Sequence, residues 1–403
     1  MKFEVAKLLS KFADFAGYIM YKFLVLLSIR RPILIVHFPT NSIGRLLPDF
    51  EEFFSDVDLT DNMIILGFFD KAVVNRLVTD YITSKICIMP NQLMVRVETL
   101  IDRSNNNFNL KNYSHGKGHF YPNSILNSSQ FKIEFGQFLN SERNKYTVVP
   151  QINSPYVTLC IREPTEVQVN DNLRNSSVTI FDDSVRFLLG QGFAIARMSR
   201  DAQTPISRVS NDFIVDYPFT SFKSDFADFA LFKDSSFCIS TGFGVDHFAS
   251  FFEIPVLTMN CALMATYLRV QKRFFLPKVF ISLERGFVLS VDEIVDRKLH
   301  LIQNDRDLKK EGVELVDNSD LVMNLAIQEF IDNDFFVNIN INKRYFELSS
   351  RLASAQFSYF SEQFGTKEKR FSSNFDLASL ILISEHWPNF TSPGLRYEKR
   401  TNV

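Results

Sequence analysis

The chain has 403 residues, of which 46% are hydrophobic and 22% are charged, and its formal net charge is −2. This length exceeds what one hydrophobic core comfortably fills, so we expect two domains, and the composition excludes a disordered chain. The near-neutral charge argues against a wide nucleic-acid-binding surface, so no nucleic-acid partner is predicted. Phe is unusually frequent, with 43 residues against one Trp, and we interpret this excess as bulky filling of the core.

Residues 1–31 predict an amphipathic helix close to a membrane. The stretch FAGYIMYKFLVLLSIRRP at 15–32 is apolar and basic, but Lys22 interrupts it and Arg30 and Arg31 end it. It is too short to span a bilayer comfortably, and no signal-cleavage site follows it. Two interpretations stay open, namely a helix docked on its own domain and a helix that lies on an anionic membrane as a peripheral contact.

Strand and helix patterns alternate through the first half of the chain. The expected strands are 33–39, 62–69 and 85–90, and the expected helices are 46–54, 71–82 and 128–140. Strands that alternate with helices of about 10–15 residues indicate βαβ units and a mainly parallel sheet. An irregular segment rich in Asn and Ser interrupts this alternation at 102–125.

The alternation resumes after a predicted domain boundary near 148–155. The expected strands are 156–161, 193–198, 213–218, 237–241 and 254–260, and the expected helices are 179–192 and 224–235, with a further amphipathic helix after residue 244. We therefore predict an α/β fold of two Rossmann-like domains with a cleft between them. The predicted N-terminal domain is 32–150, the C-terminal domain is 151–330, and a helical extension follows at 331–403.

Polar residues lie where the predicted strands of the second domain end. Arg162 follows the strand 156–161, Arg197 lies at the end of 193–198, and Ser240 to Gly242 close 237–241. Open α/β sheets bind ligands outside the carboxyl ends of their strands, and the guanidinium fork suits phosphate oxygens. Both arginines have an ordinary surface salt bridge as the alternative.

The turn STGFG at 240–244 stands at the start of a predicted helix. The first N–H groups of a helix are unpaired and favour an anion. The plain alternative is a tight connection in which Gly244 permits close helix–sheet packing. Asp246 would complement the helix dipole in the first turn.

Several familiar motifs are absent from the sequence. TGFGVDHFAS at 241–250 is neither a dinucleotide-binding fingerprint nor a P-loop, and no G-x-S-x-G elbow or H-E-x-x-H helix occurs. No C-x-x-C pair occurs among four cysteines, which all lie in apolar sequence surroundings: Cys87, Cys160, Cys238 and Cys261. This pattern disfavours a zinc ribbon or redox motif and suits a reducing cytoplasm.

Three segments resemble a family of bacterial glycosyltransferases encoded in surface-polysaccharide gene clusters. They are YVTLCIREPTE at 156–166, RNSSVTIFDDSVRFLLGQGFAIARMSR at 174–200 and VDYPFTSFKSDFADFALFKDSSFCISTGFGVDHFASFFEIPVLTMN at 215–260. The likeness covers roughly residues 154–265 in order and spacing, and SIGRLLPDFEEF at 42–53 resembles the first βα loop of the family. The arrangement is also distantly similar to fucosyltransferases of the GT-B fold.

The resemblance implies a donor site. Arg162 would bind the donor diphosphate, with Asn175 and Arg197 beside it. The nucleotide or phosphate pocket would be lined by the residues of the turn, namely Ser240, Thr241, Gly242 and Gly244. The family turn typically reads serine-glycine, and this chain departs from it with Thr241-Gly242-Phe243-Gly244.

The implied function is a glycosyltransferase that moves a sugar from a nucleotide-sugar to a surface-glycan or lipid-linked acceptor. We expect it in the cytoplasm, near the inner face of the membrane. Arginine and helix N–H groups can stabilise a leaving diphosphate without metal, so neither metal nor cofactor is expected. The alternatives are a sugar-nucleotide epimerase or hydrolase on the same fold, and a non-catalytic glycan-assembly protein.

His37 is the candidate catalytic base. It lies at the end of the first predicted strand and would face the predicted cleft from the N-terminal domain. The alternative is a buried histidine at the end of a strand.

Overall fold

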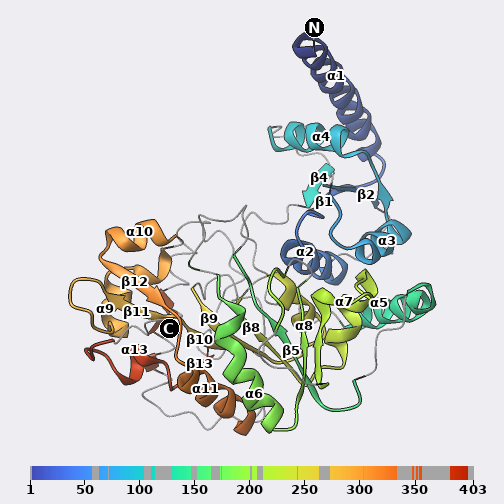
Figure 1. The fold of residues 1–403 in the computed structure, drawn as a ribbon. Coiled ribbons are helices and arrows are strands. Elements are labelled where there is room, and N and C mark those ends of the chain that lie inside the picture. Colours follow the sequence, from blue (N-terminus) through green and yellow to red (C-terminus); the bar gives the residue numbers. More distant parts are fainter. Residues whose placement is uncertain are drawn as a thin grey trace. The chain divides into compact units, whose positions relative to one another are not determined.

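The chain folds into two compact α/β units in a computed structural model, Met1–Lys145 and Tyr146–Val403 (Figure 1). The structure describes residues 2–56, 63–70, 72–103, 110–113, 129–146, 152–164, 173, 175–199, 202–206, 212–242, 244–262, 273–302, 304–333, 347–348, 351–352, 354–355 and 382–397. Each unit is built on a parallel sheet. The α/β class and the Rossmann-like organisation predicted for both halves are therefore confirmed.

The first unit contains a four-stranded sheet in the order β3-β2-β1-β4. Its strands are β1 (Ile33–Phe38), β2 (Ile64–Phe69), β3 (Cys87–Ile88) and β4 (Leu110–Tyr113). All three pairings are parallel, and Ile33 lies opposite both Ile64 and Leu110. The prediction of an irregular segment at 102–125 was wrong at β4. The four residues of this strand, LKNY, are too few and too polar to show a strand pattern in the sequence.

Five described helices surround this sheet. They are α1 (Lys2–Ser28), α2 (Ile43–Asp56), α3 (Arg76–Lys85), α4 (Asn91–Arg103) and α5 (Ser129–Glu142). The helix α3 begins where the side chain of Asn75 accepts a hydrogen bond from the backbone N–H of Val78, which satisfies one of the orphan donors of a helix start. Among the described helices, none contains a stretch long and apolar enough to cross a membrane.

Aromatic rings fill the space between α2, α3 and α5. Phe50 is fully buried, and its ring packs edge-on against Tyr81, Phe131 and Phe135 with centroid separations of 5.7, 4.9 and 5.1 Å. Edge-to-face pairs add stability beyond the apolar area that they bury. The interpretation of the excess of Phe as core filling is confirmed here.

The second unit contains a seven-stranded sheet in the order β13-β10-β9-β8-β5-β6-β7. Its strands are β5 (Tyr156–Cys160), β6 (Ala194–Arg197), β7 (Ile214–Asp216), β8 (Phe237–Ser240), β9 (Val256–Cys261), β10 (Arg273–Pro277) and β13 (Leu382–Ile383). Every pairing is parallel. From β5 the chain proceeds outward through β6 and β7, and it then returns to the other side of β5 with β8. The order of the sheet therefore reverses between β5 and β8.

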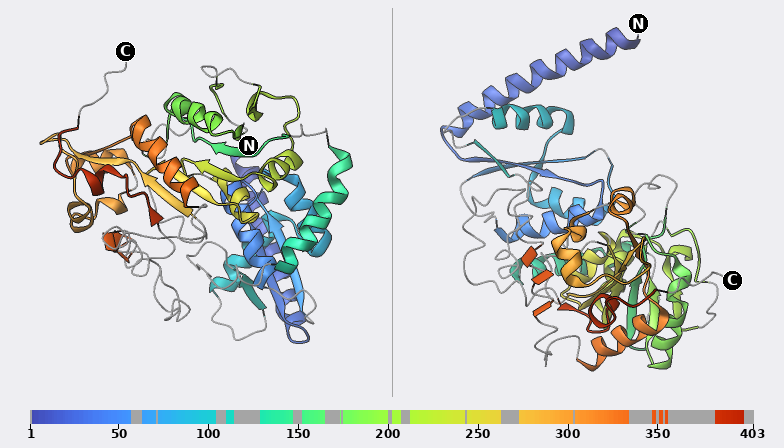
Figure 2. Two further views of the ribbon diagram at one scale, coloured as in Figure 1. Left: turned by 90° about the horizontal axis from the view of Figure 1, so that it is seen from below. Right: turned by 90° about the vertical axis from the view of Figure 1, so that its left-hand side faces the viewer.

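Further helices and a two-stranded antiparallel sheet belong to the described part of the second unit (Figure 2). The α-helices are α6 (Asp182–Gly190), α7 (Asp225–Lys233), α8 (His247–Phe251), α9 (Val291–Asp296), α10 (Asp305–Lys310), α11 (Asp320–Asp332) and α13 (Pro388–Thr391). The strands β11 (Val279–Ser282) and β12 (Val313–Val316) pair in antiparallel fashion. The helix α9 begins with a capping box, in which Ser290 and Glu293 bond each other's backbone N–H.

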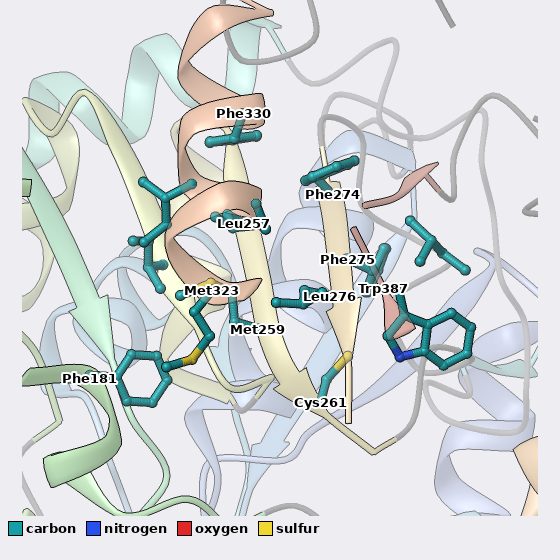
Figure 3. Close-up of a cluster of buried hydrophobic side chains, with 14 of the residues drawn as sticks. Phe181, Leu257, Met259, Cys261, Phe274, Phe275, Leu276, Met323, Phe330 and Trp387 are labelled. Atoms are coloured by element: carbon teal, nitrogen blue, oxygen red, sulfur yellow. The ribbon is translucent and has the colours of Figure 1, made fainter. Parts of the chain in front are cut away.

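One part of the core of the second unit lies between α11 and the strands β9 and β10 (Figure 3). Phe330 of α11 stacks on Phe274 of β10 with a centroid separation of 5.9 Å, and both side chains are fully buried. Met323 lies about two turns earlier on the same face of α11 and is also fully buried. All six residues of β9 are buried, as expected of a strand that is covered on both faces of the sheet.

The cysteines are all free thiols. Cys160, Cys238 and Cys261 are buried in the core of the second unit, in keeping with their apolar sequence surroundings. Cys87 is exposed despite its apolar sequence surroundings, because it lies on the two-residue strand β3 at the edge of the sheet.

The helical extension predicted at 331–403 falls largely outside the described residues. Within it the structure describes the end of α11, a few residues between 347 and 355, and the segment 382–397. That last segment adds β13 to the edge of the sheet and buries Trp387 against Phe280.

Candidate functional site

Arg162 and the turn after β8 meet at the carboxyl edge of the seven-stranded sheet. The backbone N–H of Arg162 donates to Oγ1 of Thr241 at 2.9 Å, and the N–H of Thr241 donates to the carbonyl of Cys160 at 2.9 Å. These bonds join the ends of β5 and β8, where the order of the sheet reverses. In open α/β sheets the ligand crevice lies outside the carboxyl ends of the strands at this switch point. The fold therefore places the predicted residues at the position where such a sheet binds a ligand.

The turn itself is shaped by a serine and a glycine. Oγ of Ser240 accepts a hydrogen bond from the N–H of Gly242 at 2.9 Å and donates to Oδ2 of Asp246 at 2.7 Å. Gly242 has a φ of 81°, which a residue with a Cβ adopts only with strain. The hydroxyl groups of Ser240 and Thr241 are both buried and bonded within the protein. They therefore hold the turn in shape, which differs from the ligand-lining role predicted for them.

A buried ion pair lies beneath this turn. Arg273 donates to both carboxylate oxygens of Asp246, at 3.0 and 2.9 Å, and also to the hydroxyl groups of Thr258 and Ser250. Both charged side chains are completely buried. Burial alone would raise the pKa of Asp246, but the guanidinium of Arg273 and the hydrogen bonds outweigh it and hold the pKa below its usual range.

Asp246 lies at the N-cap of α8, near the helix start where a partner of the helix dipole was predicted, but its side chain makes no capping hydrogen bond and pairs with Arg273 instead. The chain after Gly242 forms a 3₁₀ turn, Gly244–Asp246, and α8 spans only five residues. Its dipole is correspondingly small.

Asn175 lies beside Arg162 on the same edge. The N–H of Ser176 donates to the carbonyl of Arg162 at 2.9 Å, and Nζ of Lys278 donates to the carbonyl of Asn175 at 2.8 Å. Within the described part of the chain, Oδ1 and Nδ2 of Asn175 are buried and make no hydrogen bond. A buried polar group left in this state costs roughly 1–3 kcal/mol, so a ligand that bonds this amide would recover part of that cost. The side chain of Arg162 is half-buried.

Arg197 lies on this edge but points into the protein. Its side chain is 0% exposed and pairs with Glu163 at 3.1 Å and Asp216 at 3.3 Å, and it donates to the carbonyl of Thr204. Glu163 in turn accepts hydrogen bonds from the N–H groups of Gln203 and Thr204. Arg197 therefore joins the ends of β5, β6 and β7 to the loop 202–206. Sequence reasoning had placed it beside the diphosphate.

The carboxylate partners of Arg197 differ in their surroundings. Burial raises the pKa of Asp216 above its usual range, although the N–H of Ile206 and the guanidinium of Arg197 act in the opposite direction. The network thus joins the fully buried guanidinium of Arg197 to two carboxylates and to the loop 202–206. Its function in the site is to position the residues around it.

His37 belongs to the first unit, at the carboxyl end of β1. Its Nε2 lies 3.1 Å from Oδ1 of Asp70, which follows the neighbouring strand β2, and its ring stacks on Phe68 at 4.6 Å. The side chain is 31% exposed, so it is not the buried histidine that the sequence left as the alternative. A carboxylate on one ring nitrogen fixes the orientation of the imidazole and leaves the other nitrogen for a proton.

Sequence reasoning missed the residues that support this edge from β10. Lys278 follows β10, is 5% exposed, and pairs with Asp317 at 3.1 Å. The apolar run FFLP at 274–277 was the signal for this strand, and the flanking Arg273 and Lys278 carry the missed charges. Among the described residues, no group of three or more His, Cys, Asp or Glu side chains could hold a metal ion.

The chain is similar to several solved structures at low identity. The glycosyltransferase TibC from enterotoxigenic E. coli, described as iron-containing and dodecameric, matches with 16% identity and a TM-score of 0.32, over 59% of this chain and 60% of TibC. The match therefore spans about three fifths of TibC. E. coli ADP-heptose LPS heptosyltransferase II matches with 10% identity and a TM-score of 0.33, over 56% of this chain and 83% of that one.

An enzyme of a different class also matches. UDP-GlcNAc 2-epimerase from Methanocaldococcus jannaschii shows 14% identity and a TM-score of 0.25, over 61% of this chain and 65% of that one. No protein-family model matches the sequence, and no curated protein matches it. The function is therefore argued from the residues of the site.

Proposed function

We propose that this protein is a glycosyltransferase with a GT-B-type pair of domains, and that it takes its sugar from a nucleotide-sugar. The observation that carries the proposal is the meeting of Arg162, the Asn175 amide and the Gly242 turn at the switch point between β5 and β8. A guanidinium and an unbonded buried amide suit the phosphate and sugar oxygens of such a donor. The resemblance of residues 154–265 to glycosyltransferases of polysaccharide gene clusters supports the same assignment.

Sugar transfer requires positive charge next to the diphosphate of the donor. In sugar transfer the bond between the anomeric carbon and the diphosphate breaks, and the diphosphate leaves with one more negative charge. Arg162 would stabilise this charge, while Arg197 holds the ends of β5 and β6 in place. Donors placed in advance at a developing charge lower the barrier because they need no reorganisation during the reaction. The proposal needs no metal and no cofactor.

The acceptor hydroxyl forms the new bond to the sugar and loses its proton. We assign that proton to His37, which Asp70 orients through its 3.1 Å contact. The acceptor is a surface glycan or a lipid-linked sugar. Work on such an acceptor would bring the protein to the cytoplasmic face of a membrane as a peripheral contact.

Replacing His37 with Gln is expected to lower kcat about 10²–10⁴-fold, the usual contribution of a positioned general base. Asp70→Asn should lower kcat less, because the imidazole remains but loses the carboxylate that orients it. Steady-state kinetics with the accepted donor would measure both effects. Donor affinity should stay unchanged in both variants, and an undiminished kcat in His37→Gln would remove His37 from the mechanism.

A donor screen followed by product analysis tests the function itself. Nucleotide-sugars and free nucleotides would be tested by thermal shift, since a ligand at 100 times its Kd adds about 2.7 kcal/mol to the free energy of unfolding. The donors that bind would then be incubated with glycan and lipid-linked acceptors, and the products analysed by mass spectrometry. A glycosylated acceptor supports the proposal. An altered sugar formed without acceptor indicates an epimerase, and binding without turnover indicates a non-catalytic protein.

A further inference from the structure

The helix α1 has an exposed apolar face. Five large apolar side chains lie on it, each more than half exposed: Phe12 (71%), Phe15 (61%), Ile19 (52%), Phe23 (53%) and Leu26 (65%). Their spacing of three, four, four and three residues keeps them within an arc of roughly 80° on a helix that turns 100° per residue. We call these five residues the outer face of α1.

The opposite face of the same helix is already used for packing. Tyr21 and Leu24 are buried in a cluster with β1, β2 and α4. A Cβ at Gly17 would lie 2.7 Å from Cβ of Arg96, so α1 and α4 approach closely at this point. Asp14 also pairs with Arg96 at 2.7 Å. The helix α1 is therefore already docked on its own unit through the opposite side, and this packing does not use the outer face.

Exposed basic residues lie on α1 and directly after it. Lys11, Lys22, Arg30 and Arg31 are all exposed, and the exposed carboxylate of Asp14 is paired with Arg96. Over residues 1–31 the sequence has six Lys and Arg and two Asp and Glu. The surface around the apolar stripe is thus positively charged.

We propose that the outer face of α1 lies in the interface of an anionic lipid membrane, parallel to the surface. An exposed apolar stripe with a basic border suits the boundary between lipid tails and negatively charged headgroups. A second copy of the chain fits less well, because pairing two outer faces would bring two basic borders together. The absence of a spanning stretch in the described helices agrees with a helix that lies on the membrane. This inference stands on α1 alone and does not depend on the proposed chemistry.

The test uses the full chain and two matched leucines. Leu26 on α1 is 65% exposed and Leu321 on α11 is 68% exposed, so Leu26→Glu and Leu321→Glu make the same change at equally open positions. Co-sedimentation with vesicles of phosphatidylcholine containing a third phosphatidylglycerol measures binding. We expect Leu26→Glu to weaken binding about tenfold or more, and Leu321→Glu to bind like the unaltered protein. Replacing Arg30 and Arg31 together with Gln should weaken binding to these vesicles roughly tenfold and leave binding to pure phosphatidylcholine unchanged.

Two results would overturn the proposal. One is equal vesicle binding by the unaltered protein and Leu26→Glu, with unchanged melting temperatures. The other is a dimer in light scattering that Leu26→Glu converts to a monomer without any vesicle binding, since the outer face would then pair two chains. Nucleotide affinity should be the same in Leu26→Glu and the unaltered protein, so failure here remains distinct from failure of the donor site.

Discussion

Replacing Arg273 with Met is expected to lower the free energy of unfolding by about 3–5 kcal/mol at neutral pH. Arg273 and Asp246 are both completely buried and joined by two hydrogen bonds. Methionine retains much of the side-chain volume but leaves the carboxylate of Asp246 without its countercharge in the core. The loss should also loosen the turn, because Asp246 holds Ser240 and Ser240 holds the N–H of Gly242.

The effect of Arg273→Met should depend on pH in a defined direction. In the unaltered protein the pKa of Asp246 is held low, so its contribution is present above the unfolded pKa of about 3.9 and is lost as pH falls through the folded value. In the variant, burial without the guanidinium would raise the pKa of Asp246, and protonation at low pH would relieve the penalty. The difference between the two proteins should therefore shrink between neutral pH and about pH 4.

Urea unfolding at several pH values measures this difference, and Arg186→Met provides the control. Arg186 forms an exposed ion pair with Asp183, and such pairs contribute about 1 kcal/mol or less. A loss for Arg273→Met no larger than that for Arg186→Met would show that the buried pair does not stabilise the fold around the turn.

Replacing Gly242 with Ala is expected to weaken donor binding at least about tenfold, which corresponds to 1.4 kcal/mol. The added Cβ occupies the place where a phosphate would approach the backbone of the turn. It also imposes a φ of 81° on a residue with a side chain, which costs about 1–2 kcal/mol of stability.

A second glycine separates these two effects. Gly192 has a φ of 87°, and a Cβ placed there meets no atom within 4 Å. It precedes β6, at the amino end of the sheet, whereas Gly242 follows the carboxyl end of β8. Gly192→Ala should therefore lose a similar amount of stability and bind the donor normally, as measured by calorimetry. Equal donor affinity in the two variants would show that the Gly242 turn is not part of the donor-binding site.

The strands and the edge of the site could be predicted because their signals are local. Val157, Leu159 and Cys160 mark a buried strand, and a parallel sheet sends the ends of β5 and β8 to one edge whatever the details of packing. That rule alone is enough to bring Arg162 and the Ser240–Gly242 turn together.

The partners of each charged group could not be predicted in the same way. Arg197 is buried because Glu163 and Asp216 converge on it from the two neighbouring strands, and this follows from strand order rather than from the sequence around Arg197. The pairing of Asp246 with Arg273 joins two elements that are distant in the sequence, and no local spacing predicts it. Strand β4 was missed because its pairing with β1 outweighs its weak strand propensity.

The central claim is that Arg162 binds a diphosphate at the switch point between β5 and β8. Calorimetric titration of the donor found by the nucleotide-sugar screen, into the unaltered protein, Arg162→Lys and Arg162→Ala, tests it most directly. We expect Arg162→Lys to lose roughly 1–3 kcal/mol of binding free energy, because lysine retains the charge and lacks the fork, and Arg162→Ala to lose more. Arg285→Ala, at an exposed ion pair with Glu293, should bind normally. Unchanged affinity in Arg162→Ala, with an unchanged melting temperature, would contradict the assignment of this edge as the donor site.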